Sequence, residues 1–192
     1  MDGKRTKRIG VLAIQGAFRE HRKVLEKLGV QVVEVRSKED LTDLQGLIIP
    51  GGESTAIGKQ LELDGFGDRI REMSDQGVPI FGTCAGMILL SKRVDQSQQY
   101  TLGLMDTLVK RNAFGRQIAS FEADISVKGF SGDVRAVFIR APYVLETGSQ
   151  VEVLGEYSGK IVFVRQNNIL ACAFHPELTS DEKVHKYFLQ MI

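Results

Sequence analysis

Apolar runs and polar turns alternate along the first half of the chain. The continuous apolar run at residues 9–14 predicts a strand that is buried on both faces. An amphipathic helix is expected at 18–28, because Val24, Leu25 and Leu28 recur at helical spacing. The same alternation predicts strands at 30–35, 47–50 and 78–81, helical material over 57–76 with an interruption at 65–67, and an apolar helix from 85 to 90.

The second half is rich in short β-type runs that are separated by turn residues. We expect strands at 104–109, 118–127, 134–139, 151–157, 161–165 and 169–174, with Asn167-Asn168 as a hairpin turn. A final helix is predicted at 181–191, with Ser180 as its N-cap. Together the two halves predict an α/β fold: a three-layer, doubly wound, mostly parallel sheet with an antiparallel extension. Residues 1–192 are expected to form a single domain, with 1–7 as a loose N-terminal leader.

Composition and charge narrow the class of protein. The chain has 192 residues, of which 43% are apolar and 26% charged, and its net charge of +1 gives no field that would attract nucleic acid or an anionic membrane. The basic residues near the start, Lys4, Arg5, Lys7 and Arg8, are interpreted as a solvated leader. No apolar run is long enough to span a bilayer, and no signal-peptide pattern opens the chain. We therefore expect the protein to be located in the cytoplasm.

The segment Gly82-Thr83-Cys84-Ala85-Gly86 lies between a predicted buried strand and an apolar helix. This is the G-x-nucleophile-x-G pattern of a nucleophile elbow, in which glycines permit a sharp turn. The turn would place Cys84 at a helix N-terminus, where the helix dipole favours a thiolate. It would also place the N–H of Ala85 near the position at which an oxyanion forms during the reaction. The alternative is that Cys84 is a small buried apolar residue, which is how Cys172 is interpreted.

Phe174-His175-Pro176-Glu177 ends the last apolar strand. Residues two apart in extended chain face the same way, so Glu177 could fix the tautomer of His175, the general base. The His-x-Glu pattern is weak by itself, and its weight comes from sharing a sheet edge with Cys84. His21 and His185 are expected to be partly exposed helix residues, and no zinc-ligand spacing surrounds His175.

A glycine-rich loop follows the strand at 47–50, with the sequence Pro50-Gly51-Gly52-Glu53-Ser54-Thr55. It fails the test for a phosphate-binding loop, because Gln60 follows Lys59 and the acidic Glu53 would repel phosphate. The loop could supply a second oxyanion N–H from Gly52, or it could be a plain turn after a strand.

These motifs together resemble the class I, triad-type glutamine amidotransferases, and among them the glutaminase subunits of pyridoxal 5′-phosphate synthases. Other segments that carry the resemblance are 12–18 with Glu20-His21, 111–117, 121–124, 138–142 and 174–179. It runs from about Arg8 to the C-terminal helix.

The resemblance implies that Cys84, His175 and Glu177 form the catalytic triad and that L-glutamine is hydrolysed to glutamate and ammonia. A separate synthase subunit would use the ammonia to build pyridoxal 5′-phosphate, so this chain would need no cofactor and no metal. The implied glutamine contacts are Gly52, Glu53, Ser54, Arg111, Ile139 and Arg140. An acidic side chain suits the ammonium of glutamine and an arginine its carboxylate, although either arginine could instead be a surface residue or an ion-pair partner.

Two other classes of protein remain open at the level of sequence. A cysteine peptidase or amidase on a similar fold would act without a partner, and a non-catalytic regulatory subunit would bind glutamine with Cys84 idle. Gln15-Gly16, at the same predicted sheet edge, is the candidate for part of a docking surface. The implied role of Glu53 and the arginines disfavours a peptidase, and an intact triad disfavours an idle cysteine.

Overall fold

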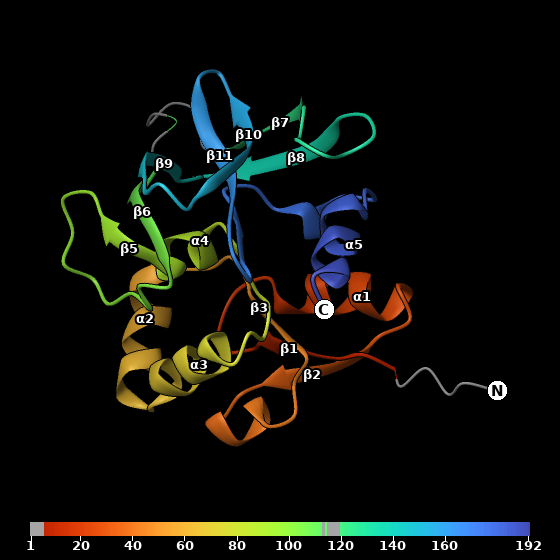
Figure 1. The fold of residues 1–192 in the computed structure, drawn as a ribbon, viewed down its shortest axis with the longest axis vertical. Helices are drawn as coiled ribbons and strands as arrows, with labels where there is room; N and C mark the ends of the chain where they lie inside the picture. Colours follow the sequence, from red (N-terminus) through yellow and green to blue (C-terminus); the bar gives the residue numbers. More distant parts are fainter. Residues whose placement is uncertain (1–5, 113, 115–119) are drawn as a thin grey trace.

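The computed structural model describes residues 6–112, 114 and 120–192, and a ten-stranded sheet runs through the centre of this part of the chain (Figure 1). Five neighbouring strands are parallel, in the order β2 (Gln31–Val35), β1 (Arg8–Leu12), β3 (Gly46–Ile49), β4 (Ile80–Thr83) and β12 (Ile169–Cys172). The parallel half therefore carries the segments that precede Gln15, Gly51, Cys84 and His175 at one set of strand ends.

The sheet continues beyond β12 in mainly antiparallel pairs. It adds β11 (Lys160–Gln166), β9 (Tyr143–Thr147), β6 (Met105–Lys110) and β5 (Ser91–Val94), while β10 (Glu152–Tyr157) pairs with β11. A separate hairpin pairs β7 (Ser120–Ile125) with β8 (Val134–Ile139). The parallel sheet with an antiparallel extension confirms the predicted fold class.

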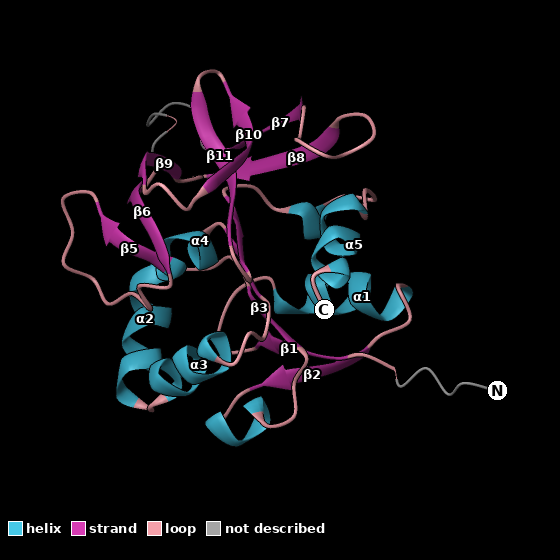
Figure 2. Ribbon diagram, in the orientation of Figure 1, coloured by secondary structure: helices cyan, strands magenta, loops and turns pink. Residues whose placement is uncertain are grey.

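Helices cover both faces of the parallel strands, as Figure 2 shows. On one side are α1 (Phe18–Lys27) and α5 (Lys183–Gln190), and on the other are α2 (Ser54–Leu63), α3 (Phe66–Asp75) and α4 (Ala85–Leu90). Short 3₁₀ helices occur at Lys38–Leu41 and Pro176–Leu178. Because both faces are covered, central strand residues such as Ile48, Phe81 and Leu170 are fully buried, which explains their continuous apolar runs.

The structure departs from the sequence-based expectations at several places. The strands β5 and β9 were not predicted, because both mix exposed polar and buried apolar residues too irregularly for a period-two pattern. Helix α5 begins at Lys183 with Glu182 as its N-cap residue, so the assignment of Ser180 was wrong. Of the strand predicted at 118–127, residues 118 and 119 lie outside the described residues. The predicted hairpin turn at Asn167-Asn168 is confirmed, with Gln166 paired to Ile169.

Candidate active site

Cys84 occupies the single position between the end of β4 and the start of α4. Its backbone has φ of 50° and ψ of −102°, a region that side chains with a Cβ rarely adopt. A hydrogen bond of 2.8 Å from its N–H to the carbonyl oxygen of Cys172 fixes the turn to the neighbouring strand β12. The strained turn therefore holds the thiol at the carboxyl edge of the parallel strands.

The two glycines of the elbow are needed because backbone passes very close to them. A Cβ on Gly86 would overlap the backbone carbonyl of Ile49 in β3, and one on Gly82 would meet the backbone of Gly86. Neither position can accept a larger residue without moving main chain. The G-x-C-x-G spacing thus reflects the packing of α4 directly against the strands beneath it.

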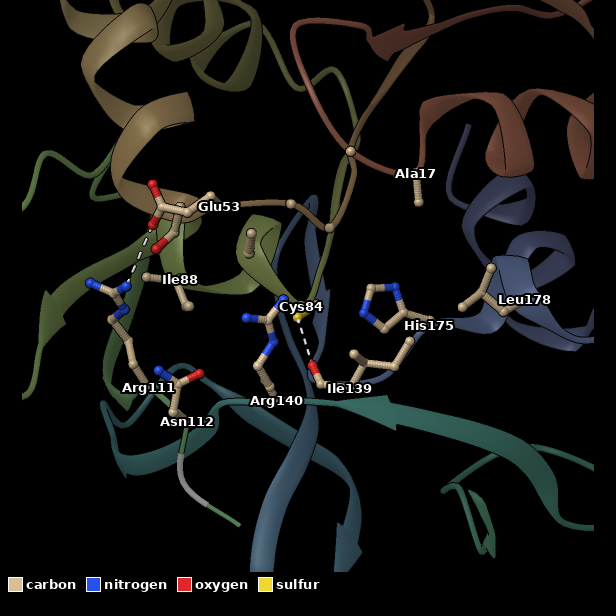
Figure 3. Close-up of a pocket in the computed structure, with 15 residues that line it drawn as sticks. Ala17, Glu53, Cys84, Ile88, Arg111, Asn112, Ile139, Arg140, His175 and Leu178 are labelled. Carbon is tan, nitrogen blue, oxygen red and sulfur yellow. Dashed lines mark hydrogen bonds and ion pairs between the residues drawn. The ribbon is translucent and has the colours of Figure 1, made fainter. Parts of the chain in front are cut away.

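His175 and Glu177 follow β12 and lie together behind Cys84. The Nδ1 of His175 is 2.6 Å from Oε1 of Glu177, and the His175 N–H donates to the carbonyl of Val137 in β8 at 2.8 Å. With Nδ1 engaged by the carboxylate, Nε2 is the ring nitrogen that faces Cys84 in Figure 3. The structure thereby brings the three predicted triad residues into one line.

The electrostatics of this line favour a protonated imidazole. Burial acts to lower the pKa of His175, but the pairing with Cys84 and the hydrogen bond to Glu177 outweigh it and raise the pKa to about 10. Burial acts to raise the pKa of Glu177, and the neighbouring His21 and His175 bring it below its usual value. At neutral pH the pair is therefore an imidazolium hydrogen-bonded to a buried carboxylate.

The glycine loop after β3 lies against the triad. A Cβ on Gly51 would overlap the ring of His175, so the loop approaches the imidazole as closely as backbone can. The N–H of Ala17 donates to the carbonyl of Gly51 at 3.1 Å. Because C=O and N–H of a trans peptide point in opposite directions, this bond directs the N–H of Gly52 away from Ala17.

A cavity of about 370 Å³ opens in front of Cys84, within the range of small-molecule sites. Figure 3 shows His175 on one side of Cys84, with Arg140, Arg111 and Glu53 on the other. The residues that line it are Gly16, Ala17, Gly51, Gly52, Glu53, Ser54, Cys84, Ala85, Ile88, Arg111, Asn112, Ile139, Arg140, His175 and Leu178. Every predicted site residue except Glu177, which stands behind His175, therefore reaches this cavity.

Opposite charges face each other at the far end of the cavity. Glu53 caps α2 by accepting hydrogen bonds from the N–H groups of Thr55 and Ala56, and the first of these is the main cause that lowers its pKa. Arg111 lies 3.5 Å from Glu53 and donates to Gln99 at 2.9 Å. An acidic and a basic side chain at this distance can receive the ammonium and the carboxylate of a zwitterion.

Two histidines that sequence analysis set aside belong to the same cluster. His21 and His185 are both fully buried, so the expectation that they are partly exposed was wrong. The missed signal was helical spacing, since His21 stands four residues before the buried Leu25 and His185 three before Phe188. Gln99 and Thr83, which contact site residues, carried no signal in the sequence.

Part of the motif at 111–117 lies outside the described residues, namely 113 and 115–117. In the part of the chain that the structure describes, no group of three or more His, Cys, Asp and Glu side chains is arranged to hold a metal ion. No helix among the described residues is long and apolar enough to cross a membrane.

The chain is similar to known proteins in both sequence and structure. Residues 11–192 match the SNO glutamine amidotransferase family. The pyridoxal 5′-phosphate synthase subunit PdxT of Niallia circulans is 53% identical over 185 residues, which cover 96% of this chain and 97% of that one. The PdxT subunit of Dehalococcoides mccartyi strain BAV1 is 56% identical over 188 residues and 96% of each chain. A crystal structure of a glutamine amidotransferase superposes with a TM-score of 0.92 at 49% identity, covering 95% of this chain and 97% of that one.

Proposed function

The chain belongs to the SNO glutamine amidotransferase family, and from this premise we propose that Cys84, His175 and Glu177 are the catalytic triad of its glutaminase reaction. The chain hydrolyses L-glutamine to L-glutamate and ammonia as the glutaminase subunit of a pyridoxal 5′-phosphate synthase, like its relatives. The observation that carries the triad assignment is the line from Cys84 through His175 to Glu177, with the 2.6 Å contact at its far end.

The first half of the reaction forms a thioester. The Cys84 thiolate attacks the side-chain carboxamide of glutamine, and the C–N bond breaks as His175, which holds the thiol proton, passes it to the departing nitrogen. Glu177 keeps Nδ1 of His175 protonated and balances the positive charge of the ring. Ammonia leaves, and the acyl group remains on the sulfur.

The second half returns the enzyme to its starting state. Neutral His175 takes a proton from water as the hydroxide attacks the thioester carbon. The C–S bond then breaks and glutamate leaves, which restores the Cys84 thiolate and the His175 imidazolium. Both halves pass through a tetrahedral oxyanion, for which we propose the N–H groups of Ala85 and Gly52 as donors. Ala85 follows the nucleophile directly, and Gly52 lies in the loop that packs against His175.

We propose that the cavity binds glutamine through the loop Gly52-Glu53-Ser54, through Arg111 and through Ile139-Arg140. Glu53 is assigned to the ammonium group and an arginine to the carboxylate, because charge-assisted hydrogen bonds of this kind orient a zwitterion. The carbonyl oxygen of Ile139 lies 3.8 Å from the sulfur of Cys84 and fixes that wall of the cavity beside the nucleophile.

The synthase subunit is the partner that consumes the ammonia. We propose that Gln15-Gly16 forms part of the docking surface. Gln15 accepts a 2.7 Å hydrogen bond from the N–H of Glu53, so a change at this position would reach the oxyanion loop directly. Losing one oxyanion donor typically costs about 10²–10³ in rate, which is enough for docking to control activity. We further propose that residues 1–192 act as one glutaminase domain and that the protein works in the cytoplasm.

The test is release of glutamate from glutamine by the purified chain, with and without the matching synthase subunit. We expect release that rises strongly with the partner and that disappears when Cys84 is alkylated. A folded, reduced protein that releases no glutamate in either condition would overturn the proposal.

A further inference from the structure

The three histidines of the chain form one buried line that starts at the triad. Beyond His175, the second carboxylate oxygen of Glu177, Oε2, lies 3.4 Å from Nε2 of His21. The Nδ1 of His21 is in turn 2.9 Å from Nε2 of His185. The triad thus continues from the segment that follows β12 through α1 to α5, although these helices take no direct part in the reaction proposed above.

The hydrogen-bonding options of this line select one set of tautomers. If His185 donates from Nε2 to Nδ1 of His21, then Nε2 of His21 carries a hydrogen and can point it at Oε2 of Glu177 and at Thr83 Oγ1, 3.1 Å away. The reverse arrangement would aim a lone pair at the carboxylate. It would also leave an N–H on Nδ1 of His185, a buried atom with no partner among the described residues. Orphaned buried N–H groups are rarer than unpaired acceptors, so the first arrangement is favoured.

Both helix histidines are neutral in this arrangement. Burial lowers the pKa of His21, and it lowers the pKa of His185 to about 3. The charged groups around them are Glu177 and His175 on the triad side, Glu20 on α1 and Glu182 at the start of α5. A neutral donor beside Glu177 satisfies the carboxylate without competing for its negative charge, which stays available to His175.

Oε2 of Glu177 depends on this contact. The Glu177 side chain is fully buried, and Oε2 has no hydrogen-bond partner in the described part of the chain. His21 Nε2 lies within reach of it at 3.4 Å, and a small turn of the imidazole ring would direct its N–H at Oε2. An unpaired buried carboxylate oxygen is costly, so without the donor the carboxylate would rotate or take up a proton.

We propose that His21 is a positioning residue of the glutaminase reaction: its Nε2–H holds Glu177 ionised and aligned on His175, and His185 fixes the tautomer of His21. The inference rests on the proposed triad, because it acts only through Glu177 and His175. Outer hydrogen-bond partners that orient metal-bound histidines are typically worth about 10- to 100-fold in affinity or activity, and we expect an effect of the same size for the partner of this triad.

Substitutions at His21 separate this role from simple packing. The amide of glutamine can replace Nε2 of histidine, whereas asparagine reaches only the place of Nδ1, and leucine has no polar group. We therefore compare His21→Gln, His21→Asn and His21→Leu, with Leu25→Ala as a control for packing damage on the same helix. Leu25 is equally buried in α1 and contacts no triad residue by hydrogen bond.

The assay is glutamate release by each variant in complex with the synthase subunit, with kcat and KM determined separately. We expect His21→Gln to stay within about fivefold of the unsubstituted chain, and His21→Asn and His21→Leu to lose about 10- to 100-fold in kcat at nearly constant KM. The Leu25→Ala control should lower thermal stability and leave kcat unchanged. Full kcat in the asparagine and leucine variants would overturn the proposal, as would an equal loss in the glutamine variant.

A second readout does not depend on turnover. The pKa of His175, followed by NMR in the chain without its partner, should fall from about 10 by roughly one unit in His21→Leu and stay in place in Leu25→Ala. An unchanged His175 titration in His21→Leu would contradict the positioning role even if the glutaminase activity of that variant were reduced. Failure of the unsubstituted complex to release glutamate would instead count against the proposed function, and the titration would still decide the role of His21.

Discussion

The backbone N–H of Cys84, directly after β4, donates a hydrogen bond of 2.8 Å to the carbonyl oxygen of Cys172, the last residue of the adjacent parallel strand β12. Both are free thiols, yet their surroundings differ. Cys172 is completely buried, and burial raises its pKa, whereas Cys84 opens onto the cavity and faces His175. One cysteine opens onto the candidate active site and its neighbour is part of the core.

This contrast predicts selective chemistry at Cys84. Iodoacetamide should label Cys84 much faster than Cys172, and glutamine should slow the labelling, as measured by peptide mass spectrometry. Cys84→Ala should lower glutamate release by about 10⁴-fold or more, because the nucleophile is lost. Cys172→Ala, the matched control, should keep most of the activity; equal labelling of the two thiols would argue for an idle Cys84.

Substitution of Glu177 should affect turnover more than binding. Glu177→Gln keeps the size of the side chain but removes the charge that supports the His175 imidazolium, so we expect kcat to fall about 10³- to 10⁴-fold. KM for glutamine should change little, since Glu177 lies behind His175 and does not line the cavity. A variant that instead raised KM and kept kcat would place Glu177 in substrate binding.

The arginines of the cavity should act on binding. Removing a charge-assisted hydrogen bond typically costs about 1.5–3 kcal/mol, so Arg111→Ala or Arg140→Ala should raise KM for glutamine by roughly 10- to 100-fold. Arg135→Ala is the control, because Arg135 pairs with Glu122 and Asp124 on the exposed face of the β7–β8 hairpin. If neither cavity variant alters KM, the carboxylate of glutamine is bound elsewhere.

A methyl group on the glycine loop tests the close approach of Gly51 to His175. Gly51→Ala would place a Cβ against the imidazole ring, so we expect a loss of activity of about 10²-fold or more as ring or loop moves. At Gly155 a Cβ would find only neighbours at 3.5 Å or beyond, which makes Gly155→Ala a suitable control. Comparable kcat values for the two variants, measured in the synthase complex, would show that the loop tolerates displacement.

The buried histidines predict a pH dependence of stability. The pKa of His185 is lowered from 6.5 to about 3, so the unfolded chain binds this proton first as pH falls. The stability that depends on neutral His185 is fully present above pH 6.5. Between pH 6.5 and pH 3 the equilibrium constant for folding falls by about tenfold per pH unit on account of this group. His185→Gln should flatten the difference in stability between pH 6.5 and 5, as measured by urea unfolding. An identical slope in both proteins would contradict the buried neutral histidine.

The alkaline side follows from His175, whose pKa is raised to about 10. Here the folded chain holds the proton more tightly, so the stabilising contribution is complete below pH 6.5 and disappears as pH rises towards 10. His175→Gln should remove this alkaline loss of stability between pH 7 and 10. If the free energy of unfolding of the variant falls as steeply between pH 7 and 10, the alkaline loss of stability comes from other groups.

The local pattern of the sequence was sufficient for the parallel half of the fold and for the sharp turn at Cys84. Continuous apolar runs predict strands covered on both faces, and Gly82 and Gly86 around Cys84 predict a sharp turn because only glycine permits such close backbone contact. His175 and Glu177 pair as their spacing predicted, although the structure places Glu177 in the 3₁₀ helix Pro176–Leu178 and not in an extended segment. The strands β5 and β9 escaped prediction because their pairing partners, rather than their own periodicity, stabilise them.

Tertiary structure alone decided which distant residues surround the triad. His21 and His185 are 164 positions apart, and no local pattern relates either of them to Glu177. They meet because α1 and α5 pack on the same face of the sheet, next to the segment after β12 that carries His175 and Glu177. A sequence records spacing along one segment, whereas a buried line of polar side chains from three segments exists only after the chain has folded and excluded water from between them.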